Sequence, residues 1–223
     1  MTEPLDEPAP GLWTWQARHP EWHPGEFGRL VRSWAVAVET GVVLVDPLLP
    51  ADGAETADAL AAAVAGRAVT IVVTIPYHAR SSAELSARFA GAPVLGHRNC
   101  AARFDDGVPF RAIAPGDELP HAMQVLPVGS PRRTEQPLWI PERRALALGD
   151  AIVGAEGGLR VWVQQKVTPA RERWFSERLA PTLRRLIEVE PEAALVTHGR
   201  AVLAGAAAAL DEAIEAGPWR PRR

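Results

Sequence analysis

Short, continuous runs of apolar residues recur along the chain, and each ends abruptly in polar residues. The clearest are Val42–Val45, Val69–Thr74, Ala145–Leu148 and Ala193–Thr197. An uninterrupted apolar run of roughly four to eight residues is typical of a strand whose two faces are both covered. Strands of this kind need further layers on both sides, so the chain is constrained to an α/β (or α+β) architecture with buried sheets.

The segments between these runs have the patterns of further strands and helices. Strands are predicted at Trp34–Glu39, Pro93–Gly96, Ala122–Pro127, Leu138–Ile140 and Leu159–Val163, a helical turn at Asn99–Phe104, and helices at Ala54–Ala65, Ala83–Phe89, Pro169–Val189 and Ala201–Ala216. Strands and helices mix in both halves, and no linker separates the halves. This favours one domain over residues 1–223.

The N-terminal region is predicted to contain a tail followed by an arm or a hairpin. Residues 1–10 are acidic and rich in proline, which indicates a disordered tail. Residues 11–32 are predicted to form an irregular arm or a short edge hairpin. The tryptophans of this arm, Trp13, Trp15 and Trp22, would form an aromatic wall over a pocket, a part of the core or a subunit contact.

Composition narrows the possible partners. The formal net charge is −3, with 24 basic and 27 acidic residues, which gives no electrostatic case for a nucleic-acid partner. The single cysteine, Cys100, cannot form an internal disulfide or a thiolate metal site alone. The acidic N-terminus is not a signal peptide, and no apolar run approaches the ~20 residues of a membrane span. We therefore expect a cytoplasmic protein with no membrane partner.

Several of the predicted strands end in residues with chemically versatile side chains. His78 and Arg80 follow one strand, Asp150 follows another, and His198 follows a third. In open α/β architectures, sites form where loops converge at the ends of strands. A carboxylate with imidazoles in such a place suits a metal site or an acid–base pair.

The order of these segments resembles the metallo-β-lactamase superfamily over roughly residues 34–205. The matching segments are Asp46 after a buried strand, Thr74-Ile75-Pro76-Tyr77-His78-Ala79-Arg80, Gly116-Asp117-Glu118-Leu119, Pro127-Val128-Gly129-Ser130, Gly149-Asp150 and Thr197-His198-Gly199. The resemblance implies a four-layer αββα sandwich with mixed sheets. It also implies hydrolase-like chemistry on a small-molecule substrate.

The metal-binding motif that this resemblance implies is degenerate. Position by position, the family's five ligands from the histidine-rich motif and the later loop fall on Ile75, Tyr77, Ala79, Arg80 and Ser130. Only Asp150 and His198 remain as metal ligands. Catalytic zinc usually has three protein ligands. His78 is the candidate third ligand, one residue out of register and so on the opposite side of an extended segment. At most one zinc, iron or manganese ion is implied, and a site without metal is the stronger expectation.

Arg80 stands where the family has a histidine ligand. Its guanidinium is permanently charged and matches a carboxylate in a bidentate pair. We hypothesise that Arg80 pairs with Asp150 and replaces the charge of the metal. The alternative is that Arg80 holds an anionic ligand such as a carboxylate or a phosphate.

Three functions remain open at this stage. The first is a hydrolase-like enzyme in which one metal, held by Asp150, His198 and His78, activates a water. The second is a metal-free relative that binds a small molecule, or performs acid–base chemistry, with His78, Arg80 and His198. The third is a pseudoenzyme that kept only the fold. In each case Asp46, Tyr77 and Ser130 are expected to line the pocket, although Asp46 before Pro47 also suits a plain turn.

Overall fold

The computed structural model describes residues 5–23, 27–130 and 132–221. It contains a seven-stranded sheet with the strands in sequence order. These strands are β1 (Asp6–Ala9), β2 (Leu12–Arg18), β3 (Leu30–Val38), β4 (Gly41–Val45), β5 (Val69–Val73), β6 (Val94–Gly96) and β7 (Phe110–Ala112). From β1 to β4 each strand pairs antiparallel with the next, whereas from β4 to β7 each strand pairs in parallel with the next.

The second half of the chain supplies two smaller sheets. One has the order β13-β10-β9-β8 and the other the order β11-β12-β14. Their strands are β8 (Gln124–Val125), β9 (Leu138–Ile140), β10 (Ala145–Leu148), β11 (Ile152–Ala155), β12 (Gly158–Trp162), β13 (Ala193–Val196) and β14 (Pro218–Trp219). Both β10 with β13 and β12 with β14 pair in parallel, within otherwise antiparallel sheets.

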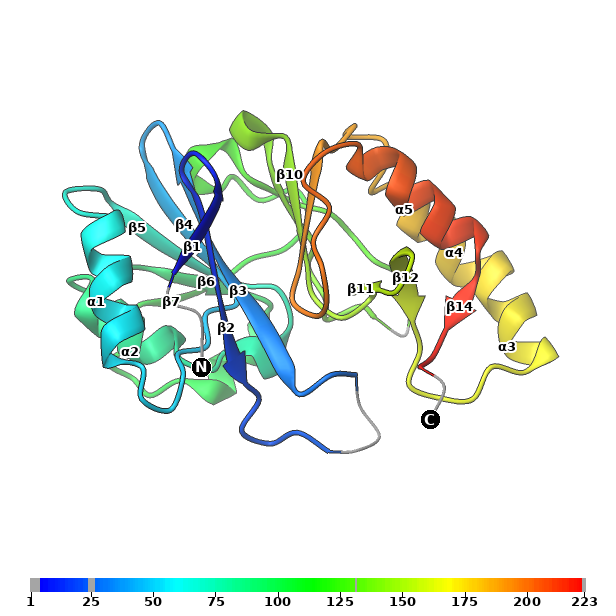
Figure 1. The fold of residues 1–223 in the computed structure, drawn as a ribbon, viewed down its shortest axis with the longest axis horizontal. Helices are drawn as coiled ribbons and strands as arrows, with labels where there is room; N and C mark the ends of the chain where they lie inside the picture. Colours follow the sequence, from blue (N-terminus) through cyan, green and yellow to red (C-terminus); the bar gives the residue numbers. More distant parts are fainter. Residues whose placement is uncertain (1–4, 24–26, 131, 222–223) are drawn as a thin grey trace.

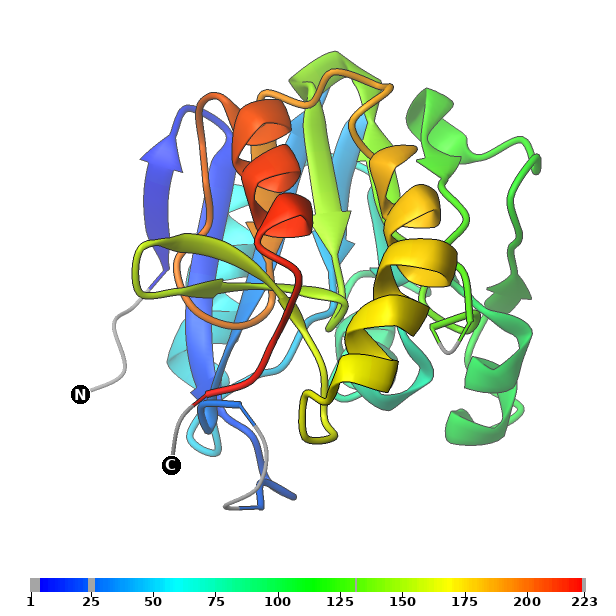
Figure 2. The ribbon, with the colours of Figure 1, turned by 90° about the vertical axis from the view of Figure 1, so that its right-hand side faces the viewer.

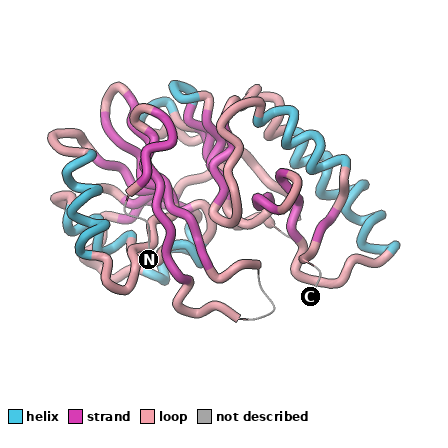
Figure 3. Tube along the Cα trace, viewed as in Figure 1, coloured by secondary structure: helices cyan, strands magenta, loops and turns pink. Residues whose placement is uncertain are grey.

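Helices cover both outer faces, which makes the architecture αββα (Figure 1). The helices α1 (Ala54–Ala63) and α2 (Ser82–Arg88) lie against the seven-stranded sheet, and α3 (Pro169–Trp174), α4 (Ala180–Arg184) and α5 (Ala206–Glu215) cover the opposite side. Figure 2 faces this second helix layer, with α5 in red beside the yellow α3 and α4. Coloured by element type, the tube shows strands between two helical layers (Figure 3).

Three separate core regions confirm the layers that the apolar runs predicted. Leu44, Ile71 and Leu60 pack between the seven-stranded sheet and its helices. Val43 and Val45, on the opposite face of the same strand as Leu44, pack with Leu195 between the two main sheets. A third region lies under α3 to α5. Because both faces of β4 and β5 are buried, their sequences are continuously apolar rather than alternating.

The N-terminal predictions need correction. Residues 6–9 form strand β1 rather than a disordered tail, while residues 1–4 lie outside the described residues. For residues 11–32, predicted as an irregular arm or a short edge hairpin, the hairpin is the nearer description, because Leu12–Arg18 is a regular strand that pairs with β1 and with β3. Trp15 is buried and its Nε1 donates to the carbonyl of Leu48 at 2.8 Å, so this tryptophan belongs to the core.

The predicted helix Pro169–Val189 is interrupted. A single π-helical turn, Phe175–Leu179, joins α3 to α4, which ends at Arg184. Pro181 explains the wider turn, because proline has no N–H to donate and its ring collides with the carbonyl four residues earlier. The last helix also starts later than predicted, at Ala206 after Gly205 with φ of +69°. In the described part of the chain, no helix is long and apolar enough to cross a membrane.

Candidate functional site

Four side chains from four strand ends meet between the two main sheets. Asp46 follows β4, His78 follows β5, Asp150 follows β10 and His198 follows β13. β4 pairs in parallel with β5, and β10 pairs in parallel with β13. The carboxyl ends of each pair therefore lie at one sheet edge, where sites form in α/β architectures. We call these four residues the site cluster.

Asp46 is the buried anchor of the site cluster. Its Oδ1 accepts the Thr74 N–H at 2.7 Å, and its Oδ2 accepts the Thr74 hydroxyl at 2.5 Å and faces Nδ1 of His78 at 2.9 Å. The residue has φ of +47°, a left-handed conformation that aspartate tolerates better than most. Asp46 therefore does more than form a turn. The sequence predicted that Asp46 lines the pocket. In the structure it lies beneath the pocket instead.

His78 connects the carboxylates of Asp46 and Asp150. Its Nδ1 faces Asp46, and its Nε2 lies 3.4 Å from Oδ1 of Asp150. The segment after β5 is not extended, because Pro76 begins a one-turn 3₁₀ helix, η1 (Pro76–His78), that turns the ring inward. The prediction that His78 points to the opposite side of an extended segment is therefore wrong.

The two carboxylates determine the charge of His78. Burial and the nearby Arg80 favour the neutral ring, but Asp46 and Asp150 outweigh them and raise the pKa of His78 above its ordinary 6.5. Burial would in turn raise the pKa of Asp150, yet His78 and His198 hold this pKa well below its usual range. The raised pKa extends to higher pH the range in which His78 is an imidazolium between the two carboxylates.

His198 completes the cluster as a neutral ring. Its Nε2 lies 3.6 Å from Oδ1 of Asp150, and Phe27 packs edge-on against it with ring centroids 5.4 Å apart. Burial lowers the pKa of His198 to about 4, although Asp150 acts in the opposite direction. Asp150 thus has two imidazole neighbours whose pKa values are shifted in opposite directions.

Arg80 does not form the predicted pair with Asp150. Neither Asp150 nor any other carboxylate among the described residues lies within 4.0 Å of its guanidinium, and His78 contacts Asp150 instead. Both Nε and Nη1 of Arg80 are buried without a hydrogen-bond partner in the described part of the chain. Burial lowers the pKa of Arg80, while Asp46 and Asp150 oppose this shift. The backbone at Arg80 is also strained, with φ of +34°.

A pocket of about 400 Å³ opens over the site cluster. His78, Arg80, Asp150 and His198 line its inner part. The rest of the lining is partly aromatic, with Trp22, Phe27, Tyr77 and Trp162, and partly charged, with Glu21, Arg103 and Arg132. Of the three tryptophans considered in the predicted arm, Trp22 therefore lines the pocket and Trp15 lies in the core. Part of that arm, residues 24–26, lies outside the described residues.

Two of the predicted pocket residues are more peripheral. Tyr77 is 68% exposed at the rim, with the guanidinium of Arg103 5.3 Å from its ring centroid. Ser130 is exposed and lines a separate surface hollow with Thr168 and Trp174. Ser130 is therefore not part of the pocket over the site cluster.

The structure adds a buried glutamate that sequence reasoning missed. Both carboxylate oxygens of Glu135 lie 2.9 Å from the Ala151 nitrogen that donates to them, next to Asp150. Burial raises the pKa of Glu135 to about 7 despite Arg132, whose Nη1 lies 3.8 Å away. Gly149 leaves the space, since a Cβ there would lie 3.1 Å from the Glu135 carboxyl carbon. A glutamate in a polar loop carries no sequence signal for this role.

The site cluster does not fit the metal that the fold resemblance implies. Within residues 5–23, 27–130 and 132–221, no group of three or more His, Cys, Asp or Glu side chains is arranged to hold a metal ion. Both ring nitrogens of His78, the candidate third ligand, already face carboxylates. A metal ligand needs a free ring nitrogen.

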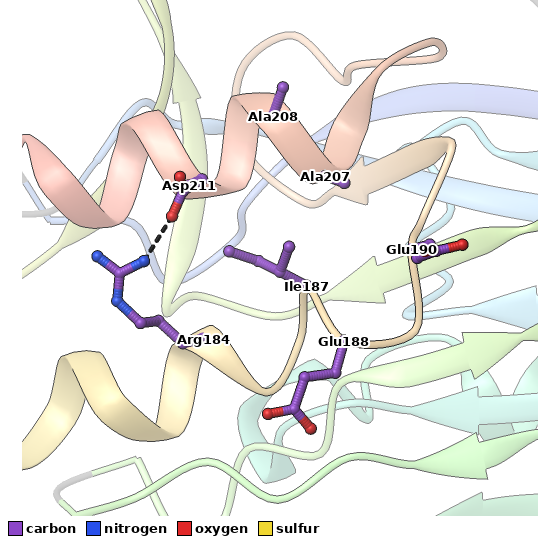
Figure 4. A pocket seen from close by; sticks show the side chains of 7 residues that line it. All are labelled: Arg184, Ile187, Glu188, Glu190, Ala207, Ala208 and Asp211. Atoms are coloured by element: carbon purple, nitrogen blue, oxygen red, sulfur yellow. Dashed lines mark hydrogen bonds and ion pairs between the residues drawn. The ribbon is translucent and has the colours of Figure 1, made fainter.

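Another hollow lies on the far side, between α4 and α5 (Figure 4). There Arg184 points to Asp211, with Nη1 2.6 Å from Oδ1, and its Nη2 lies 3.9 Å from Glu215. This hollow is shallow and its arginine is already paired. Its arginine is therefore not free to bind a ligand.

Comparison with known proteins identifies the fold. No family model and no curated protein matches the sequence. Solved structures do match, among them a metallo-β-lactamase from Pontibacter korlensis, with a TM-score of 0.65 and 14% identity over 96% of this chain and 99% of that one. The metallo-β-lactamase FIM-1 from Pseudomonas aeruginosa, in its mono-zinc form, matches with a TM-score of 0.62 and 13% identity, covering 96% of each chain.

A third match has a different named activity. It is the rubredoxin oxygen:oxidoreductase from Desulfovibrio gigas, with a TM-score of 0.65 and 15% identity over 95% of this chain and 61% of that one. The chain thus has the four-layer metallo-β-lactamase fold, as predicted. Since proteins with different activities share this fold, the function must be argued from the site.

Proposed function

We propose that this protein is a metal-free binding protein, built on the metallo-β-lactamase fold, that takes a small anionic molecule into the pocket over the site cluster. The observation that carries the proposal is the unpaired guanidinium of Arg80. Its Nε and Nη1 are buried beside the pocket with no hydrogen-bond partner among the described residues. Arg80 lines this pocket, and a guanidinium forms charge-assisted hydrogen bonds with a carboxylate or a phosphate.

The energetics support this assignment. A buried donor without a partner costs about 1–3 kcal/mol, and the left-handed backbone of Arg80 adds strain. Residues that destabilise the folded protein and make no compensating structural contact are typical of functional sites. No metal is needed to supply positive charge between Asp46 and Asp150, because His78 already lies between these two carboxylates.

Thermal unfolding with added anions tests the proposal, because a ligand of the native state raises the melting temperature. Acetate, benzoate, phosphate and phenyl phosphate are compared at constant ionic strength with wild type, Arg80→Met and Arg185→Met. Arg185 is exposed and lies outside the pocket, so it is the matched control. We expect stabilisation of wild type and Arg185→Met but not of Arg80→Met. Without ligand, Arg80→Met should melt no lower than wild type.

Two results would overturn the proposal. One is that no anion stabilises the wild-type protein, or that Arg80→Met responds as wild type does. The other concerns metal: about one zinc, iron or manganese ion per chain after mild dialysis would remove the metal-free part.

A hydrolase-like activity is the second candidate, favoured by the position of Asp150. Its Oδ1 lies 3.4 Å from Nε2 of His78 and 3.6 Å from Nε2 of His198, at the floor of the pocket. An imidazolium and a neutral imidazole in one pocket suit acid–base catalysis. Ester, thioester, amide and phosphoester substrates are assayed with chelator and with added zinc. Turnover that is lost in His198→Gln would support this candidate, and no turnover under either condition would remove it.

A further inference from the structure

Arg103 is a second arginine of the pocket that has no carboxylate partner. It ends the short helix η2 (Arg98–Arg103), which contacts η1. Its guanidinium lies over the ring of Tyr77, and no carboxylate among the described residues lies within 4.0 Å of it. A cation–π contact at an exposed site leaves most of the positive charge unmatched.

Arg132, the third arginine of the pocket, already has partners within the protein. Its Nη2 donates to the carbonyl of Trp162 at 3.1 Å, and its Nη1 lies 3.8 Å from Glu135. The guanidinium also stacks over the ring of Trp162, 5.1 Å from the centroid. Arg132 therefore holds the wall of the pocket, and Arg80 and Arg103 remain for a ligand.

These two arginines lie at different depths. Arg80 is largely buried, and two of its nitrogens are inaccessible to solvent, whereas Arg103 is exposed at the rim beside Tyr77. A ligand with two acidic groups would supply one group for each guanidinium. The same pocket has an aromatic part, to which Trp22, Phe27 and Trp162 contribute.

We propose that the ligand is a small diacid, with one acidic group held by Arg80 at the floor, a second held by Arg103 at the rim, and an apolar body against the aromatic part of the pocket. This inference rests on the proposed function and names its ligand class. Charge at the rim is screened by salt more strongly than charge at the floor. The preference for a diacid should therefore weaken as ionic strength rises, while binding through Arg80 persists.

Calorimetric titration with benzoate, the three benzenedicarboxylates and phenyl phosphate tests the diacid. We expect at least one dicarboxylate to bind wild type about tenfold more tightly than benzoate, or more. Arg103→Met should reduce the affinity for that dicarboxylate to the affinity for benzoate. The affinity of this variant for benzoate should stay within about twofold of the wild-type value. Arg98→Met, on the same short helix but outside the pocket, is the control that should behave as wild type.

The outcomes separate the two proposals. If no anion binds the wild-type protein, the proposed function fails. If benzoate binds through Arg80 but every dicarboxylate binds with a similar affinity, or Arg103→Met leaves the preference unchanged, only the diacid is overturned. Phenyl phosphate binding more tightly than every dicarboxylate, with both arginines required, would also overturn it, because both charges would then lie on one group.

Discussion

Replacing His78 with glutamine removes the imidazolium that lies between Asp46 and Asp150. Glutamine is similar in size and keeps polar atoms, so the pocket should retain its shape. It carries no charge, however, and the two carboxylates would face each other across a buried space. The expected result is a large loss of stability, because a buried charge that loses its partner is strongly destabilising.

The expected size follows from the burial of the three groups. His78 is 2% exposed, Asp46 is fully buried and the Asp150 side chain is 17% exposed, so the loss should be about 3–5 kcal/mol, as found when one partner of a buried pair is removed. Unfolding entropy is about 2.1 cal/mol/K per residue. For the 223 residues of this chain, the melting temperature should fall by about 6–11 °C.

Urea unfolding, followed by the fluorescence of the eight tryptophans, measures the loss directly. The raised pKa of His78 means that its contribution is complete below 6.5 and is lost as pH rises through the folded-state value. The lowered pKa of Asp150 means that its contribution is complete above 3.8 and is lost as pH falls. The difference between wild type and His78→Gln should therefore be largest between pH 3.8 and 6.5.

A double-mutant cycle with Asp46→Asn isolates the pair. If His78 acts through its charge, Asp46→Asn should cost less in the His78→Gln background than in wild type. His97→Gln, a partly exposed histidine outside the site cluster, is the control. A loss below about 1 kcal/mol for His78→Gln, or additive effects in the cycle, would refute the charge-bridging role, since contacting charges should couple by 0.5–3 kcal/mol.

Three further outcomes are expected. As pH rises from 4.5 to 8, the free energy of unfolding of Glu135→Gln should increase relative to that of wild type by roughly 3 kcal/mol. The reason is that ionising a buried carboxyl whose pKa is about 7 destabilises the folded wild-type protein. A difference independent of pH in urea titrations would contradict this. Cys100 is buried and its thiol pKa is raised to about 12, so a thiol reagent at pH 8 should label it only after unfolding; rapid labelling of the native protein would show otherwise. Gly199→Ala should cost more than about 3 kcal/mol, since its Cβ would lie 1.8 Å from the Gly154 carbonyl oxygen. Gly205→Ala, with a similar positive φ but open space, should cost only about 1–2 kcal/mol, and equal losses in thermal melts would refute the steric reason.

The layered fold could be predicted from local sequence patterns. Continuous apolar runs such as Val42–Val45 require two covered faces, and the polar residues that follow them mark the sheet edge where Asp150 and His198 lie. Burial and periodicity act over a few residues, so they are readable along the chain. The N-terminal strands were predicted only in part, because Leu12–Arg18 has no clear alternation that decides between an irregular arm and an edge hairpin.

The partners within the site could not be predicted in the same way. Arg80 and His78 are two residues apart, and either cation suits Asp150 by charge. The 3₁₀ turn at Pro76 brings His78 to Asp150 and leaves Arg80 beside the pocket, without a carboxylate within 4.0 Å among the described residues. Glu135 likewise reaches the Ala151 nitrogen only because the chain folds back there. The apolar runs and polar strand ends thus specify the layers and the location of the site. Which cation lies between the carboxylates, and which is left for a ligand, depends on distances of a few ångströms between segments far apart in the sequence.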